Sequence, residues 1–200
     1  SIKFFKTHSA FFDRKTDSAK FSNLDNTLGA VYVVRDPRNV ACSVKNHYSL
    51  ENFEKVKEFM FREHNWLGIV SNKNIKALDN KIPTLISSWK TNYLSWKNKT
   101  KNYLLIKYEN LIENPSDEFL KISKYLENHL KIKFEQKKIS RAIDTCSFKN
   151  LQSLEIEGKF PEATVDKENK TIKFFNLGPK NDWRKTLDKD IANEIKNQFR

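Results

Sequence analysis

Arg35 and Ser43 are the residues whose types and spacing first suggest chemistry in this chain. A run of β-branched and aromatic residues over 30–35 predicts a buried strand that ends at Arg35. Asp36 and Pro37 then form a helix start signal, because aspartate caps helix N-termini well and proline fits the first helical position. An arginine at the end of a parallel strand, with a hydroxyl on the next helix, suits an oxyanion bound at the edge of the sheet. The pattern predicts a phosphate-type site that has no glycine-rich loop.

The helix predicted over 37–48 supports this interpretation through its polar face. Asn39, Ser43 and His47 follow one another at steps of four and therefore share one side of the helix. Many α/β proteins also end a strand in a charged residue and begin the next helix with Asp-Pro. A purely structural role for this corner therefore stays open.

A second candidate segment opens the chain, where residues 2–7 predict a strand. Side chains alternate along a strand, so Lys6 and His8 are expected to point to the same face. Histidine titrates near neutral pH and can accept a proton from a reacting hydroxyl or amine. A histidine at a strand end can equally bond a neighbouring carbonyl, and Lys6 can simply be solvated.

The rest of the chain alternates helices with one more buried strand, predicted over 103–108. Residues 9–28 predict a surface loop, and residues 68–82 predict a loop or a frayed helix. Residues 157–173 hold glycine, proline and alternating charges, which is typical of a mobile flap. Helices are predicted over 37–48, 51–64, 83–98, 134–144 and 188–199, from Asn114-Pro115 onward and from Ser147 onward. Strands separated by helices favour an α/β fold, in which three α/β/α layers surround a central parallel sheet.

Several aromatic residues are expected to be structural. Trp66, Trp89 and Trp96 fall on predicted helices and are interpreted as core residues. Near the C-terminus, Trp183 is expected to anchor a loop, and the Asp182 carboxylate is expected to cap the segment that follows.

Length and charge limit the possible functions. At 200 residues the chain fits a single domain over 1–200, and its 38% hydrophobic and 12% aromatic content can build a core. A net charge of +12 favours anionic ligands, including nucleotides, nucleic acids, acidic glycans and lipid headgroups. No apolar run approaches the roughly 20 residues that span a bilayer.

Cys42 and Cys146 show no metal-ligand spacing and no CxxC pairing. Both fall in or at the edge of predicted helices, so two buried free thiols in a reducing compartment are expected. The N-terminus has no secretory signal pattern. These features predict a cytoplasmic protein without a membrane span.

Four stretches, in this order, resemble the sulfotransferases that use 3′-phosphoadenosine 5′-phosphosulfate (PAPS). Each stretch alone is a weak match, but four in the correct order are hard to obtain by chance. The residues that follow His8 look closer to the bacterial branch of the family than to its animal cytosolic members. The four stretches are Lys6-Thr7-His8, residues 35–43, Tyr108-Glu109-Asn110-Leu111 with Asn114-Pro115, and residues 178–184.

The resemblance implies a P-loop-NTPase-like sulfotransferase fold and a nucleotide site. Arg35 and Ser43 would hold the 3′-phosphate of PAPS or of its product PAP, and Tyr108 and Phe148 would lie near the adenine. Gly178 would let the backbone approach the phosphate closely. Asn176 stands where the family has an arginine and offers only a neutral hydrogen bond, and Leu177 replaces a lysine. Lys173 or Lys180 could compensate for these lost cations.

The resemblance also implies a catalytic role for His8, as the general base that takes the proton of a hydroxyl or amine acceptor. Lys6 would neutralise the sulfuryl oxygens or orient the acceptor. No metal is implied, and nothing in the sequence identifies the acceptor or the oligomeric state. The family's 5′-phosphosulfate loop normally lies well upstream of Lys6-Thr7-His8. We therefore expect the fold to be N-terminally truncated here, with this chain as the C-terminal part of a longer protein.

The leading hypothesis is thus a PAPS-dependent sulfotransferase. A catalytically inactive module that binds PAP-like nucleotides is the first alternative. A basic nucleic-acid-binding protein is the second, and it is disfavoured because acidic residues accompany the lysines along every segment. A P-loop kinase is disfavoured because the sequence has no GxxxxGK[ST] motif.

Overall fold

The computed structural model describes residues 2–12, 23–67, 84–160, 164–165 and 170–199. These residues form two compact units. The first unit holds the described residues up to Ala30, those from Lys57 to Tyr103, and Phe199; the second holds those from Val31 to Val56 and from Leu104 to Gln198. The single domain expected over 1–200 stays a prediction, because the compactness of each unit does not decide whether they fold together.

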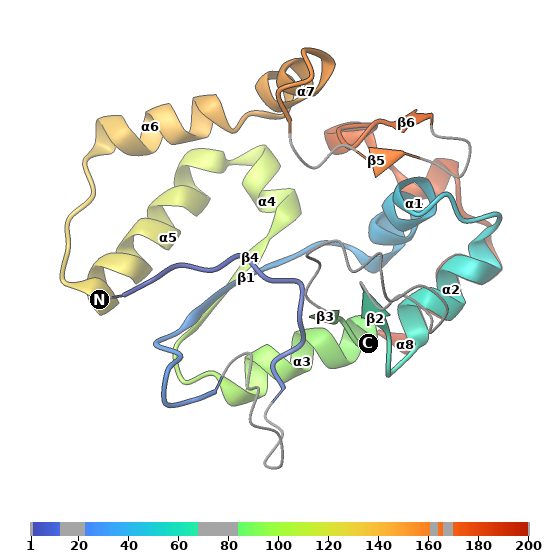
Figure 1. Cartoon of the computed structure of the whole chain (residues 1–200), viewed down its shortest axis with the longest axis horizontal. Helices are drawn as coiled ribbons and strands as arrows, with labels where there is room; N and C mark the ends of the chain where they lie inside the picture. The colour runs from blue at the N-terminus through green and yellow to red at the C-terminus, as the bar shows by residue number, and fades with distance from the viewer. Residues whose placement is uncertain (1, 13–22, 68–83, 161–163, 166–169, 200) are drawn as a thin grey trace, which may run out of the picture. The chain divides into compact units, whose positions relative to one another are not determined.

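Strands β1 (Ala30–Val34) and β4 (Tyr103–Lys107) pair side by side, as Figure 1 shows. Where the strands begin, the Ala30 N–H donates to the Asn102 carbonyl over 2.9 Å. Just past their ends, the Asp36 N–H donates to the Glu109 carboxylate over 2.9 Å. Because both starts and both ends adjoin, the strands run parallel, which confirms the predicted α/β class.

The helices of the second unit lie close to their predicted ranges, except for a short helix over 108–113 that was not predicted, since Tyr108 was expected to end the preceding strand. Helix α5 packs beside α4 and α6, and α1 packs beside α8 (Figure 1). The helices are α1 (Pro37–His47), α4 (Tyr108–Glu113), α5 (Pro115–Leu130), α6 (Gln136–Thr145), α7 (Phe148–Ile156) and α8 (Lys189–Gln198), with single 3₁₀ turns at Gly178–Lys180 and Trp183–Lys185. The segment over 157–173, predicted as a flap, contains a short antiparallel pair, β5 (Thr164–Val165) and β6 (Thr171–Ile172).

The first unit contains helix α3 (Trp89–Lys99) and the antiparallel pair β2 (Trp66–Leu67) and β3 (Thr84–Leu85). Helix α2 (Phe53–Phe61), shorter than the predicted 51–64, crosses from the second unit into this one. The prediction for Trp66 is wrong, since it lies in a strand and is exposed. Trp96 is buried on α3 as predicted.

The helix predicted over 83–98 begins only at Trp89. Ser87 has a left-handed backbone (φ +58°), which a helix does not allow, and Ser88 then caps α3 by accepting the Thr91 N–H. Residues 84–85 pair as β3 instead of entering the helix. Residues 68–82, predicted as a loop or frayed helix, lie outside the described residues.

Two expectations for the N-terminal segment are wrong. Residues 2–7 form no strand, and residues 9–11 are buried although 9–28 was expected to be a surface loop. The Phe11 ring packs edge-on against Trp96, with centroids 5.0 Å apart. The Ala10 N–H donates to the Leu85 carbonyl and the Phe11 N–H donates to the Ser95 hydroxyl, both over 2.8 Å. These bonds satisfy the buried backbone without a strand ladder.

The prediction of two buried thiols is also wrong. Both cysteines are free, but Cys42 is half-buried on α1 and Cys146 is exposed where α6 ends. Burial raises the pKa of the Cys42 thiol, although a contact with the Thr186 hydroxyl acts in the other direction. Among the helices that the structure describes, none is long and apolar enough to cross a membrane.

Candidate functional site

Arg35 is the centre of the candidate site in the second unit. Its guanidinium Nη2 donates to the Gly178 carbonyl over 3.1 Å, and its Cζ lies 4.4 Å from the centroid of the Tyr108 ring. Its Nε is buried and has no hydrogen-bond partner in the structure. The structure thus brings together Arg35, Tyr108 and Gly178, which the sequence analysis assigned to one site. Tyr108 lies 73 positions after Arg35 in the sequence, and Gly178 lies 143 positions after it.

The parallel strand pair explains why Arg35 and Tyr108 meet. Each residue directly follows its strand, and parallel strands place their carboxyl ends at the same sheet edge. The Glu109 carboxylate accepts the Asp36 N–H and so ties the start of α4 to the start of α1. This bond fixes the corner at which Arg35 leaves the sheet.

The first turn of α1 is held by Asp36 and Arg38. The Asp36 carboxylate caps the helix by accepting the Arg38 N–H over 2.9 Å, and it forms a two-point ion pair with the Arg38 guanidinium at 2.9 and 2.6 Å. Burial alone would raise the pKa of Asp36, but the hydrogen bonds and charge of Arg38, with the charge of Arg184, outweigh it and lower that pKa. Arg38 also lies over the Trp183 ring, with its Cζ 4.0 Å from the centroid.

Asn39, Ser43 and His47 share one face of α1, as their spacing predicted, and the structure shows that this face contacts the C-terminal segment. The Asn39 carboxamide oxygen accepts the Trp183 N–H over 2.9 Å. The Ser43 hydroxyl accepts a hydrogen bond from Asn181 Nδ2 over 3.1 Å. The His47 ring lies edge-on to Phe174, with centroids 5.8 Å apart. One helix face therefore positions the loop that carries Gly178.

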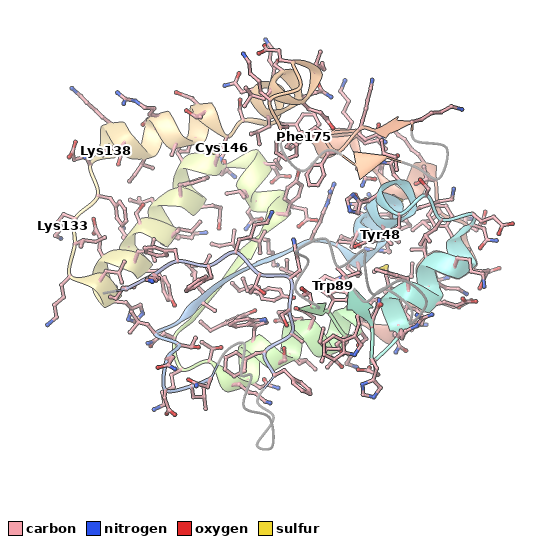
Figure 2. The ribbon with its side chains drawn as sticks, viewed as in Figure 1. Tyr48, Trp89, Lys133, Lys138, Cys146 and Phe175 are labelled. Carbon is pink, nitrogen blue, oxygen red and sulfur yellow. The ribbon has the colours of Figure 1, made fainter. Side chains whose placement is uncertain are left out.

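Position 178 requires glycine for two reasons, the backbone conformation and the closeness of the Phe148 ring. Its φ is +50°, and a Cβ placed on it would lie 2.1 Å from Cε2 of Phe148. The Phe148 ring therefore lies directly against the Gly178 backbone. Phe175, labelled in Figure 2, meets the Phe148 ring edge-on at 5.9 Å. The structure joins Phe148 to the Arg35 corner through Gly178.

The Phe174-Phe175 dipeptide is itself fixed by α7. Both backbone N–H groups donate to the Glu155 carboxylate, and Gln152 Nε2 donates to the Phe175 carbonyl over 2.8 Å. Asn176 follows this dipeptide and is exposed. No hydrogen bond joins its side chain to any residue in the described part of the chain. The nucleotide-binding role that the resemblance implies for Asn176 stays a prediction.

His8 and Lys6 belong to the first unit, and their side chains are exposed. The segment is held by its backbone: Asn92 Nδ2 donates to the His8 carbonyl over 3.0 Å, and Trp96 Nε1 donates to the Ser9 carbonyl over 2.9 Å. Since no strand forms here, alternation does not place Lys6 and His8 on one face. The catalytic roles expected for them stay predictions.

The sequence interpretation missed the contribution of Asn181. This side chain is 7% exposed, and its Nδ2 donates to the Asn39 carbonyl over 2.9 Å as well as to Ser43. Its position directly before Asp182 and Trp183, inside the C-terminal motif, was the available signal. Asp182 caps the following turn by accepting the Arg184 N–H, as predicted.

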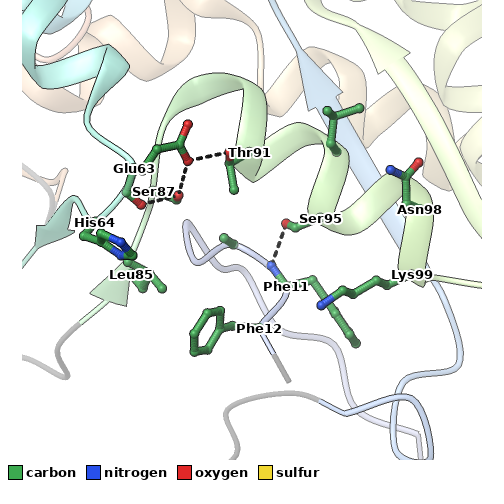
Figure 3. A pocket seen from close by; sticks show the side chains of 12 residues that line it. Phe11, Phe12, Glu63, His64, Leu85, Ser87, Thr91, Ser95, Asn98 and Lys99 are labelled. Carbon is green, nitrogen blue, oxygen red and sulfur yellow. Dashed lines mark hydrogen bonds between the residues drawn. The ribbon is translucent and has the colours of Figure 1, made fainter. Parts of the chain in front are cut away.

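The first unit also contains a cavity of about 390 Å³ between α3 and residues 10–12, shown in Figure 3. The Glu63 carboxylate at its edge accepts hydrogen bonds from the hydroxyls of Ser88 and Thr91 at 2.9 and 2.6 Å. None of the residues that the sequence analysis assigned to a site lines this cavity.

Within the part of the chain that the structure describes, no group of three His, Cys, Asp or Glu residues could hold a metal ion.

Comparison with known proteins gives a consistent result. A family model described as Sulfotransferase domain matches residues 2–200. Cytosolic sulfotransferase 12 of Arabidopsis thaliana is 34% identical over 105 residues, which are 52% of this chain and 29% of that protein. Cytosolic sulfotransferase 6 of the same plant is 33% identical over 94 residues, 46% of this chain and 28% of that protein. The expected likeness to bacterial members stays a prediction.

Solved structures share the fold. Mouse sulfotransferase SULT7A1 complexed with PAP superposes with a TM-score of 0.58 at 18% identity, over 86% of this chain and 57% of that one. Retinol dehydratase in complex with androsterone and inactive cofactor PAP gives a TM-score of 0.55 at 19% identity, over 88% and 47% of the two chains. The matched part is under a third of the plant proteins and about half of the solved chains.

Proposed function

The chain belongs to the sulfotransferase family, and we propose that it binds the 3′-phosphoadenosine part of PAPS and serves transfer of the sulfuryl group to a hydroxyl or amine acceptor. The observation that carries the proposal is Arg35. A guanidinium that already bonds the Gly178 carbonyl still has a buried Nε–H without a partner. A buried unpaired donor costs free energy, and a phosphate oxygen would satisfy it with a charge-assisted hydrogen bond.

The surrounding residues fit the rest of the nucleotide. Ser43 supplies a neutral donor on α1, and the aromatic rings of Tyr108 and Phe148 supply surfaces suited to a purine. The Gly178 backbone lies between Arg35 and Phe148, which links the anion end to the base end. The two solved neighbours contain PAP, which has this 3′-phosphate and adenine.

The transfer chemistry assigns roles to His8 and Lys6. PAPS supplies an activated sulfuryl group, whose bond to the 5′-phosphate oxygen breaks as the acceptor oxygen or nitrogen bonds to sulfur. The acceptor proton passes to the His8 imidazole, and PAP leaves with the bonding electron pair. Lys6 would neutralise the sulfuryl oxygens. The side chains at both positions are exposed.

The remaining expectations fit this function. A cytoplasmic location is proposed from the names of the plant relatives, which are cytosolic sulfotransferases. The proposal requires no metal ion. The acceptor, the partners and the oligomeric state are to be determined with the whole protein.

Calorimetric titration tests the proposal. The chain should bind PAP more tightly than ATP, and Arg35→Ala should remove that preference. The matched control is Arg62→Ala, which removes an exposed guanidinium from the first unit. Tight PAP binding that survives Arg35→Ala would overturn the site, and equal affinity for PAP and ATP would overturn the proposed ligand. Transfer from PAPS is then measured with the whole protein.

A further inference from the structure

Asn181 is a buried polar side chain that donates a hydrogen bond to Ser43, and its backbone N–H donates to the same Gly178 carbonyl that accepts Arg35. We propose that Asn181 is a positioning residue for 3′-phosphate recognition, because its carboxamide frees the Ser43 hydroxyl to donate to the phosphate. This inference rests on the proposed function.

A serine hydroxyl has one proton to donate and two lone pairs that accept. In this structure the Ser43 hydroxyl donates to the Asn39 carbonyl over 3.3 Å, within its own helix. One lone pair accepts Asn181 Nδ2 over 3.1 Å. To bind an anion, the hydroxyl must turn its proton away from the Asn39 carbonyl.

Asn181 lowers the free-energy cost of rotating the Ser43 hydroxyl away from the Asn39 carbonyl. Its second Nδ2 proton donates to the same Asn39 carbonyl over 2.9 Å, which is shorter than the bond from Ser43. When the Ser43 hydroxyl rotates toward a phosphate oxygen, the Asn39 carbonyl keeps Asn181 as a donor. Without Asn181, the hydroxyl would be the one side-chain donor left to that carbonyl and would stay directed at the helix.

The same residue joins Ser43 to Arg35. The Asn181 N–H donates to the Gly178 carbonyl over 3.2 Å, and this carbonyl also accepts Arg35 Nη2. The turn from Gly178 to Asn181 is therefore fixed at one end by Arg35 and at the other by α1. A variant at position 181 should disturb the anion site more than the adenine side.

The Oδ1 atom of Asn181 adds a second observation. It is buried and has no hydrogen-bond partner in the structure. A buried amide oxygen without a partner is costly, so any favourable contribution of this side chain comes from the bonds that its Nδ2 makes. This pattern is expected of a residue that positions others.

The test compares PAP with AMP, which differ only in the 3′-phosphate, on the 200-residue chain. The ratio of their dissociation constants should fall about fivefold in Asn181→Ala, the effect of one neutral hydrogen bond. In a Ser43→Ala background, Asn181→Ala should change the ratio little, because the two residues act through one hydroxyl. Equal losses in both backgrounds, or an unchanged ratio in the single variant, would overturn the inference.

Two further variants separate this role from a general effect on folding. Asn65→Ala is the matched control, because Asn65 is also buried and its Nδ2 donates to a backbone carbonyl, that of Phe59, in the other unit. It should lower the melting temperature and leave the PAP/AMP ratio unchanged. Asn181→Asp keeps the shape, loses both donors and can capture the Ser43 proton, so its ratio should fall further than that of Asn181→Ala. A ratio as high as in the unmodified chain would overturn the inference.

The outcomes also distinguish this inference from the proposed function. If the unmodified chain binds PAP and AMP equally, the proposed 3′-phosphate site is wrong. If it prefers PAP and the position-181 variants keep that preference, only the positioning role of Asn181 is wrong.

Discussion

Arg35 and His8 lie in different compact units. Contacts of the side chain fix Arg35, whereas a contact of the backbone fixes His8. Arg35 is fixed by its side chain, through the Gly178 carbonyl and the Tyr108 ring. His8 is fixed by its backbone, through Asn92, and its imidazole is exposed. The Arg35 corner is therefore preorganised by its own contacts, whereas the His8 imidazole is exposed, as the roles proposed for the two residues require.

The first prediction concerns His8 and carries the largest expected effect. His8→Ala in the whole protein should lower the rate of sulfuryl transfer by about 10²–10⁴-fold, the usual contribution of a general base. The affinity for PAP should stay the same, because His8 takes no part in the contacts that fix Arg35. Steady-state kinetics with a PAP titration would measure both quantities.

His129→Ala is the control for that experiment, since His129 lies on α5 beside Tyr125. It should leave transfer unchanged. Undiminished turnover in His8→Ala would remove His8 from the mechanism. The difference between the fixed Arg35 side chain and the exposed His8 side chain would then have no catalytic meaning.

The second prediction concerns the preorganised side of the comparison. Arg35→Lys keeps the charge but loses the planar fork that bonds Gly178 and lies over Tyr108. PAP affinity should fall roughly 10–100-fold, because hydrogen bonds to charged groups contribute about 1.5–3 kcal/mol. AMP affinity should change much less. Calorimetry with both nucleotides measures the difference, and equal losses would show that Arg35 acts only through the fold.

The third prediction uses, as a matched pair, the two glycines with positive φ among the residues that the structure describes. Gly178→Ala introduces backbone strain and a Cβ 2.1 Å from the Phe148 ring, whereas Gly158→Ala has φ +69° and no atom within 4 Å. Gly158→Ala should cost about 1 kcal/mol of unfolding free energy, and Gly178→Ala should cost about 1–3 kcal/mol more. Urea unfolding measures both, and equal costs would mean that the Phe148 contact is not tightly packed.

The sequence predicted the parts of this site that depend on local signals. The run over 30–35, the Asp36-Pro37 cap and the steps of four along α1 placed Arg35, Ser43 and their helix face correctly. The second strand followed from the same pattern, although it was predicted to include Tyr108, which instead begins α4 directly after the strand. Parallel pairing then brought Arg35 and Tyr108 together without any further information.

The rest depends on contacts between distant segments, which no local pattern encodes. Residues 2–7 have a strand-like composition, but a strand needs a hydrogen-bonded partner, and none of the described segments pairs with them. The burial of Phe11 follows from its contact with Trp96, which is 85 positions away. Cys146 is small and apolar, yet its place at the end of α6 exposes it.

The last prediction has the smallest effect and tests why the Arg35 corner is rigid. Asp36 has a lowered pKa in the folded chain, so its contribution to stability is present above the unfolded value near 3.8 and is lost as the pH falls through the folded value. Asp36→Asn should therefore cost about 1 kcal/mol at pH 7, as expected for a weakened helix cap and ion pair, and less at pH 3. Asp144→Asn, at an exposed position of α6, gives the effect of removing a carboxylate outside this network. Urea unfolding at both pH values measures the two differences. If Asp36→Asn costs the same at pH 3 as at pH 7, the charge of Asp36 does not hold α1, and the corner owes its order to Glu109 and the C-terminal loop instead.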